Sequence, residues 1–169
     1  MKLILLASAV FLATPAISQN DNADPMVVTA PSRPTVAAWS QTITQQLDRH
    51  LVYPQTFGRS AYPEGTVSIR FTCGDDGKPA SVTLFRGSGS RQIDRAALRA
   101  IAKMKTLHPM PLAIRDDSTF QANIIFAIDE QSLARQREVL RRNETQRIAH
   151  DTNRSQAVVV LEIGHRAEG

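Results

Sequence analysis

The feature that most narrows the folds open to this chain is a change of hydrophobic period in its middle. Residues 67–73 alternate apolar and polar side chains, the pattern of a strand with one buried face. Residues 74–78 read Gly-Asp-Asp-Gly-Lys, and Asp and Gly tolerate the positive φ angles of tight hairpin turns. A second alternating segment lies around Val82 and Leu84, and a third covers residues 120–128. Before the third segment the period becomes helical, with one apolar side formed by Ile93, Ala97, Ile101 and Met104. The sequence therefore predicts the order β-β-α-β.

This order also predicts how the three strands are arranged. A hairpin makes the first two strands antiparallel, and a right-handed crossover returns the third strand beside the first, with the helix across one face. The third strand is then an edge strand with an unpaired row of backbone N–H and C=O groups, which another strand can join. The residues of this predicted edge are Phe120, Gln121, Ala122, Asn123, Ile124, Ile125 and Phe126.

A further helix is predicted upstream, over residues 36–52. Its apolar residues recur every four positions, at Trp39, Ile43, Leu47 and Leu51. Tyr53 precedes Pro54 and is therefore pushed out of the α region, which ends the helix. The predicted fold class is α+β in the order α-β-β-α-β, with the helices on one face of a three-stranded antiparallel sheet.

Several short motifs occur in order along this region. They are Tyr53-Pro54, Gly65-Thr66-Val67, Asp76-Gly77-Lys78, Ser88-Gly89-Ser90, Ile93-Asp94 and Pro109-Met110-Pro111. The ordered set resembles the TonB C-terminal domain family of TonB/TolA-like periplasmic proteins, over roughly residues 36–129. The resemblance implies the same fold. It also implies an energy-transducer module that captures the extended TonB box of an outer-membrane receptor by adding it as a strand.

The resemblance assigns partner binding to Tyr53, Pro54 and the strand of residues 120–126. In such a complex, backbone hydrogen bonds worth about 1 kcal/mol each nearly cancel an ordering cost of about 1–2 kcal/mol per residue. We therefore expect the affinity to come from side-chain pockets near Tyr53 and along the strand. The expected interaction is weak, on the order of micromolar.

A function of another class, that of a structural envelope protein, rests on a row of cations and on a β-prone segment near the end of the chain. Arg91, Arg95, Arg99 and Lys103 recur every four residues and form one stripe along the predicted helix. Such a stripe is ordinarily a solvated helix face, and the alternative is contact with an anionic polymer such as peptidoglycan. Under this hypothesis the protein self-associates as a dimer or binds the wall without transducing energy. A formal net charge of +4, with no aromatic-basic platform, gives no indication of nucleic-acid binding.

The start of the chain predicts export. Residues 3–13 form an apolar run that spans about 16 Å as a helix, against roughly 30 Å of hydrocarbon in a bilayer. Small residues at Ala16 and Ser18 complete the pattern of a signal peptide, residues 1–18, that is removed on export to the periplasm. Residues 19–35 are polar and contain prolines, which is typical of a disordered lead-in.

The segment after the predicted domain, residues 130–169, is mostly polar. Residues 130–149 are predicted to be helical, with apolar residues too sparse for a buried face. Residues 156–164 contain a β-prone run, Val158-Val159-Val160-Leu161-Glu162-Ile163. Three arrangements of this run stay open: it pairs with the edge of its own chain, pairs with that of a neighbour, or forms a loose tail.

No set of residues predicts catalysis or metal binding. Cys73 is the single cysteine, so an intrachain disulfide is excluded, and its shared parity with Phe71 predicts a buried, unreactive thiol. Residues 87–90 lack the lysine of a phosphate-binding loop, and residues 75–77 lack the glutamate of a calcium loop. The four histidines are scattered without ligand spacing, at His50, His108, His150 and His165. We expect no enzymatic activity, no cofactor and no metal.

Overall fold

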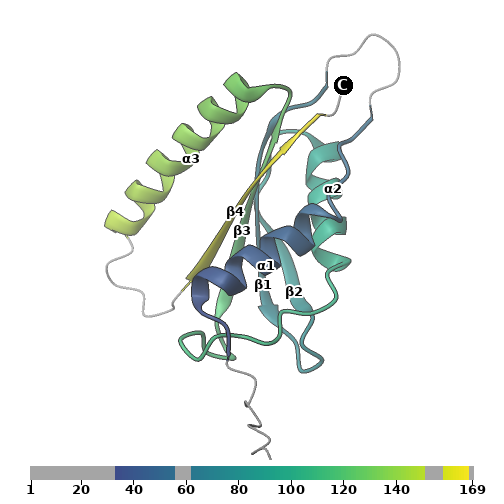
Figure 1. Cartoon of the computed structure of the whole chain (residues 1–169). Coiled ribbons are helices and arrows are strands. Elements are labelled where there is room, and N and C mark those ends of the chain that lie inside the picture. The colour runs from purple at the N-terminus through teal and green to yellow at the C-terminus, as the bar shows by residue number, and fades with distance from the viewer. Residues whose placement is uncertain (1–32, 56–61, 151–157, 168–169) are drawn as a thin grey trace, which may run out of the picture. The chain divides into compact units, whose positions relative to one another are not determined.

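The structure is a computed structural model that describes residues 33–55, 62–150 and 158–167. The predicted signal peptide and nearly all of the predicted lead-in lie outside the described residues. The elements are α1 (Val36–Asp48), β1 (Gly65–Cys73), β2 (Pro79–Arg86), α2 (Arg91–Ala102), β3 (Thr119–Ala127), α3 (Glu130–His150) and β4 (Val158–Arg166) (Figure 1). Among the described helices, none is long and apolar enough to cross a membrane.

The predicted hairpin is confirmed, with β1 and β2 antiparallel. Its turn is closed by backbone hydrogen bonds, among them one from the Gly77 N–H to the Gly74 carbonyl at 2.8 Å. The Asp76 carboxylate accepts a bond from the Lys78 N–H at 3.0 Å. Gly77 has a φ of +74°, and a Cβ there would lie 2.5 Å from Cδ2 of His108. Backbone conformation and space therefore both demand glycine at this position.

The sheet has four strands in the order β2-β1-β3-β4. β3 runs antiparallel to β1, as the right-handed crossover predicts. β4 adds a parallel neighbour on the far side of β3, with partners from Thr119↔Val158 to Ala127↔Arg166. The α+β class is confirmed, but the prediction of a three-stranded antiparallel sheet is wrong, because the C-terminal run extends it to a mixed four-stranded sheet.

The prediction that β3 is an open edge strand is also wrong for this structure. β3 lies between β1 and β4, and both of its backbone rows face a neighbouring strand. Of the arrangements open for the C-terminal run, the structure shows pairing within its own chain. The physical reason is burial, since Leu161 and Ile163 of β4 retain only 2% and 4% of their exposure. Burying each such side chain contributes about 1.5–3 kcal/mol.

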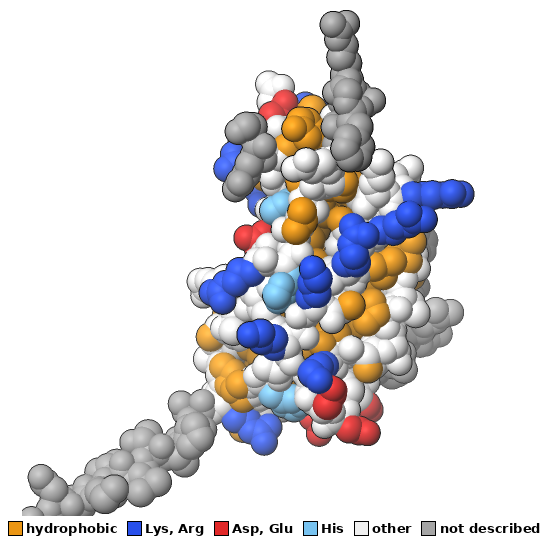
Figure 2. Space-filling view, turned by 90° about the vertical axis from the view of Figure 1, so that its right-hand side faces the viewer, with side chains coloured by type: hydrophobic (Ala, Val, Ile, Leu, Met, Phe, Trp, Pro, Cys, Tyr) orange, Lys and Arg blue, Asp and Glu red, His pale blue; other side chains and the backbone are white. Residues whose placement is uncertain are grey.

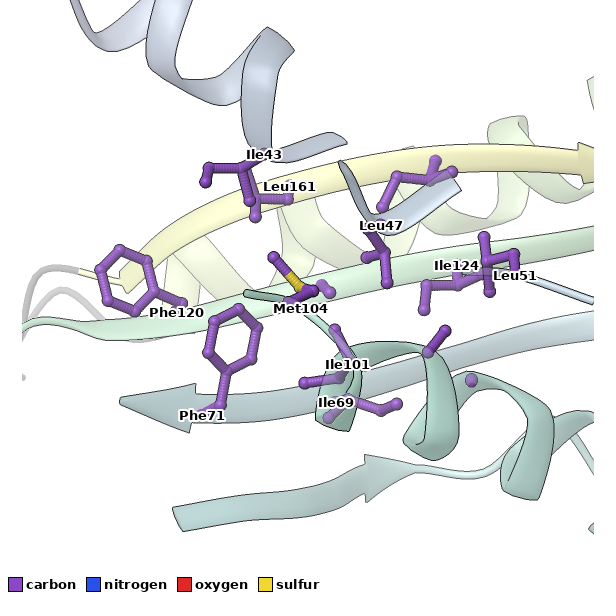
Figure 3. Packing of buried hydrophobic residues seen from close by; sticks show 14 of the residues in the cluster. Ile43, Leu47, Leu51, Ile69, Phe71, Ile101, Met104, Phe120, Ile124 and Leu161 are labelled. Carbon is purple, nitrogen blue, oxygen red and sulfur yellow. The ribbon is translucent and has the colours of Figure 1, made fainter. Parts of the chain in front are cut away.

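The main core lies between one face of the sheet and the helices α1 and α2 (Figure 3). α1 contributes Trp39, Ile43 and Leu47, the four-residue repeat expected of an amphipathic helix. The helix ends at Asp48, earlier than predicted, but Leu51 remains buried beyond it. Trp39 also donates its indole N–H to the Leu107 carbonyl at 2.7 Å, so its polar atom is satisfied in the core.

α3 lies on the opposite face of the sheet from α1 and α2 (Figure 1), which corrects the prediction that helices cover one face only. Leu133 and Leu140 are each 5% exposed and form a second cluster with Ile125 and Ala127 of β3. The two leucines lie seven residues apart and so share one side of the helix. The expectation that this segment lacks a buried face is therefore wrong, although the apolar contact is small.

Candidate partner-binding site

Tyr53 joins three parts of the molecule at one end of the sheet. Its hydroxyl donates a hydrogen bond to the Pro63 carbonyl at 2.7 Å. Its ring meets the ring of Phe126 of β3 edge-on, with centroids 5.5 Å apart, and that of Tyr62 at 5.8 Å. It stacks on His165 of β4, with centroids 6.2 Å apart. Burial, with a smaller effect from the Glu64 carboxylate, raises the pKa of Tyr53.

The aromatic rings border a cavity of about 500 Å³, which we call the Tyr53 pocket. It is lined by Asp48, Leu51, Val52, Tyr53, Gln55, Tyr62, His165, Arg166 and Ala167. The Asp48 carboxylate lies 3.4 Å from Nδ1 of His165, so an acidic group and an imidazole meet at its wall. Pro54, the second predicted residue of this region, is half-buried beside it in the chain.

The predicted strand residues 120–126 are all buried within β3. Phe120, Ala122, Ile124 and Phe126 belong to the main face or its end, whereas Gln121, Asn123 and Ile125 face α3. Phe126 is the residue that brings the strand and the Tyr53 pocket together. The backbone edge that a partner strand would use is the one that β4 occupies.

The face of the sheet beneath α3 is largely polar. Asn123 Oδ1 accepts hydrogen bonds from the Ser68 hydroxyl at 2.7 Å and from the Gln121 side chain at 3.2 Å. Gln121 also donates to the Glu144 carboxylate of α3 at 2.9 Å. Cavities of about 380 Å³ and 650 Å³ adjoin α3 toward β1 and toward β4. The interface of α3 is thus held by a few hydrogen bonds and a small apolar cluster.

The four cations predicted to form a stripe are all exposed on α2 and its C-cap. Figure 2, which views the side of the molecule that carries α2, shows Lys and Arg side chains gathered beside hydrophobic ones. Among the described side chains, no carboxylate lies within ion-pair distance of Arg91, Arg95, Arg99 or Lys103. The structure leaves these charges available to solvent or to an anionic partner.

Cys73 is half-buried, which corrects the expectation of a buried thiol. It is the last residue of β1, so the sheet covers it from fewer sides than Phe71, and its Sγ lies 3.6 Å from Nε2 of His108. Burial first, and then the charges of Asp116, Asp76 and Asp75, raise the pKa of the thiol. Within residues 33–55, 62–150 and 158–167, no three acidic, histidine or cysteine side chains are placed to hold a metal ion.

The sequence did not predict Tyr62 and His165, two of the three ring partners of Tyr53. His165 follows the β-prone run closely, but pairing of that run with β3 is what brings the imidazole to Tyr53. A signal for this contact exists only once the register of β4 is known. Tyr62-Pro63 repeats the Tyr53-Pro54 dipeptide, and this repetition was the local sequence signal for a role of Tyr62.

Comparison with known proteins places this geometry in a family context. Residues 49–128 match the family model described as Gram-negative bacterial TonB protein C-terminal. Protein TonB of Haemophilus influenzae is 30% identical over 76 residues, which cover 45% of this chain and 28% of that relative. Protein TonB of Pseudomonas putida is 26% identical over 119 residues, 69% of this chain and 44% of that relative. The chain thus spans less than half the length of these curated relatives. No solved structure matches it significantly.

Proposed function

We propose that this protein is a binding module of the Gram-negative envelope that takes up an extended segment of an outer-membrane receptor as an additional strand. The match of residues 49–128 to the family model of the TonB protein C-terminal region supports this proposal. The partner strand pairs with β3, and one end of it enters the Tyr53 pocket. The role is one of recognition and involves no catalysed reaction. The proposed setting is TonB-dependent transport across the envelope, with the protein in the periplasm after removal of residues 1–18.

The observation that carries this proposal is the β3–β4 ladder. An extended segment lies along the whole of β3, in register over nine partner pairs from Thr119↔Val158 to Ala127↔Arg166. This edge of β3 therefore accommodates a strand that is paired over its whole length. The Tyr53 ring lies near the end of that strand. A receptor segment that takes this position needs no rearrangement of β1, β2 or α2.

Side chains must supply most of the binding free energy. A five-residue strand forms about four or five backbone hydrogen bonds at about 1 kcal/mol each, against an ordering cost of about 1–2 kcal/mol per residue. The Tyr53 pocket and the main core beneath the strand supply the missing apolar contacts. The proposed affinity is accordingly micromolar rather than nanomolar.

Strand capture is tested with the exported form of the full chain and a fluorescent TonB-box peptide. We expect Tyr53→Ala to weaken binding about tenfold or more, because it removes the ring that contacts Phe126 and His165. Phe85→Ala is the matched control, since Phe85 is an aromatic residue on β2 that is 44% exposed and lies away from the pocket. Equal loss in both variants, or no binding by the unchanged protein, would remove the proposal.

The second candidate function is adhesion to an anionic wall polymer. It is favoured by one observation, the row of exposed cations on α2 without acidic partners among the described side chains. Charge-driven binding of this kind weakens steeply as salt rises. Sedimentation with purified peptidoglycan at low and high salt, with Arg95→Glu/Arg99→Glu as the variant, decides this function. Self-association as a dimer is read in the same samples from the sedimentation of the free protein.

A further inference from the structure

β4 occupies the position on β3 that the proposed partner strand needs. It runs parallel to β3 and is matched to it residue by residue, for example Ala122↔Leu161 and Ile124↔Ile163. Figure 1 shows the two strands lying together at one side of the sheet, and Figure 3 shows Leu161 close to Ile43 and Leu47 of α1. The surroundings of each β4 side chain therefore indicate which side chain a strand added to β3 can carry at that position.

The positions that face the main core accept apolar side chains. Leu161 and Ile163 belong to the core cluster and are almost fully buried, and Val159 packs partly against it. A polar or charged residue at the position of Leu161 or Ile163 would lose its hydration without gaining a partner. Alternate apolar residues are thus the first requirement for a strand at this edge.

The positions that face α3 impose different demands. Glu162 forms an ion pair with Arg137 of α3, with 3.5 Å between Oε1 and Nε. A side chain at the Gly164 position requires its neighbours to move, because a Cβ there would lie 2.8 Å from Cδ1 of Leu133 and 3.1 Å from a terminal guanidinium nitrogen of Arg137. An acidic residue and, two positions later, a glycine fit this face while α3 stays in place.

The last core-facing residue of β4, His165, lies at the Tyr53 pocket. His165 stacks on Tyr53, meets the ring of Phe126 edge-on at 5.9 Å, and has Asp48 at 3.4 Å. A flat ring at this position therefore gains two aromatic contacts, and a ring nitrogen gains a carboxylate neighbour.

We propose that β4 is an intramolecular stand-in for the partner strand and competes with it for β3. The partner that β3 selects is a parallel strand whose residues match those of β4 in type. It has apolar residues at the Leu161 and Ile163 positions, an acidic residue at the Glu162 position, glycine at the Gly164 position and an aromatic or imidazole ring at the His165 position. The inference rests on the proposed function, in which a receptor segment adds to β3. It goes beyond that function by naming the sequence pattern of the segment and its intramolecular competitor.

A strand that must displace β4 binds with an apparent affinity reduced by the fraction of molecules in which the edge is free. A chain with β4 in place about 99% of the time binds the partner about 100-fold more weakly than an open one. The competitor is tethered to the domain, so dilution does not remove it.

The test uses the full chain and a fluorescent peptide with the sequence of residues 157–166. We expect Leu161→Asp in the protein to free the edge and to strengthen binding of this peptide about tenfold or more over the unchanged protein. Val160→Asp is the control, because Val160 is on the same strand but is 41% exposed on the other face. Equal peptide affinity for the unchanged chain and Leu161→Asp overturns the stand-in role.

The pattern is tested by changing the peptide, with the Leu161→Asp protein held constant. Replacing the glycine that corresponds to Gly164 by valine should weaken binding on the order of tenfold, because its side chain meets Leu133. Replacing the glutamate that corresponds to Glu162 by lysine should weaken it a few-fold, and less so at high salt. If the valine peptide binds as well as its parent, the selection for glycine is wrong.

Two binding outcomes distinguish a failure of this inference from a failure of the proposed function. Opened protein that binds the peptide of residues 157–166 but no TonB-box peptide supports the pattern and contradicts the function. A TonB-box peptide that binds the unchanged and opened proteins equally supports the function and contradicts the stand-in role. Should Leu161→Asp fail to fold, hydrogen exchange in the unchanged chain decides: saturating TonB-box peptide must speed exchange at Leu161 and Ile163 and leave β1 protected.

Discussion

Tyr53 belongs to a motif visible in the sequence, packs against other aromatic rings, and lines the pocket proposed to bind the partner strand. α1 ends at Asp48, and Tyr53, held out of the α region by Pro54, places its ring against those of Phe126 and His165. The dipeptide was visible in the sequence as a motif. Phe126 was predicted in the same binding region, but the stacking of His165 on Tyr53 was not, because only the register of β4 on β3 brings that residue near.

The ionisation of Tyr53 gives a prediction about stability at high pH. Its pKa is raised by burial and by Glu64, so folding favours the neutral phenol. Its contribution to the free energy of unfolding is therefore complete below the ordinary tyrosine pKa of about 10 and is lost as the pH rises through the raised value. We expect urea unfolding between about pH 9 and 11.5 to show a steeper loss of stability in the unchanged chain than in Tyr53→Phe. Parallel curves would contradict the assigned environment of the hydroxyl.

Cys73 gives a second prediction at this scale. Burial and the neighbouring carboxylates raise its pKa, so less thiolate is present at neutral pH than for a free cysteine. Iodoacetamide should label the folded protein slowly and the urea-unfolded protein fast, and Asp116→Asn should speed labelling of the folded form. Asp117→Asn is the control, since Asp117 is paired with Arg115 and does not act on the thiol. Folded and unfolded protein that react at one rate would show Cys73 to be open to solvent.

At the scale of elements, sequence periodicity predicted α1 and α2, whose apolar residues repeat on one buried side. It also predicted the first three strands from alternation, although β2 has no fully buried residue and β3 is buried on both faces. α3 was not predicted to have a buried face, because its buried apolar residues in the described part of the helix are two turns apart and much of its contact with the sheet is polar. The hydrogen bonds of Gln121 and Asn123 explain why polar residues occur on a covered face of β3. A pattern of apolar residues alone has no means of predicting such an interface.

The docking of α3 is tested by comparing two substitutions on the same helix. Leu133→Asp places a carboxylate in the cluster with Ile125 and Ala127, and we expect it to lower the free energy of unfolding by about 2–4 kcal/mol. Val139→Asp should change it by less than about 0.5 kcal/mol, because Val139 is 54% exposed. Urea unfolding followed by circular dichroism measures both. A silent Leu133→Asp would mean that α3 does not stay on the sheet in solution.

At the scale of the whole molecule, the sequence predicted the α-β-β-α-β core and the resemblance that the family model over residues 49–128 supports, but not the completed sheet. The β-prone run Val158-Val159-Val160-Leu161 is compatible with several pairings, and tertiary burial of Leu161 and Ile163 is what selects one. That selection turns an expected open edge into an occupied one. The same residues that a partner strand would contact are thereby used within the chain.

Photo-crosslinking shows whether a receptor strand adds to β3. A TonB-box peptide with a photoreactive phenylalanine at its centre is bound to the full chain and irradiated, and the crosslinked residues are mapped by mass spectrometry. We predict crosslinks to residues 120–126 and, with the photoreactive group moved to the peptide's end, to Tyr53. Crosslinks concentrated on β2 or on the cations of α2, with none on β3, would contradict strand addition at this edge.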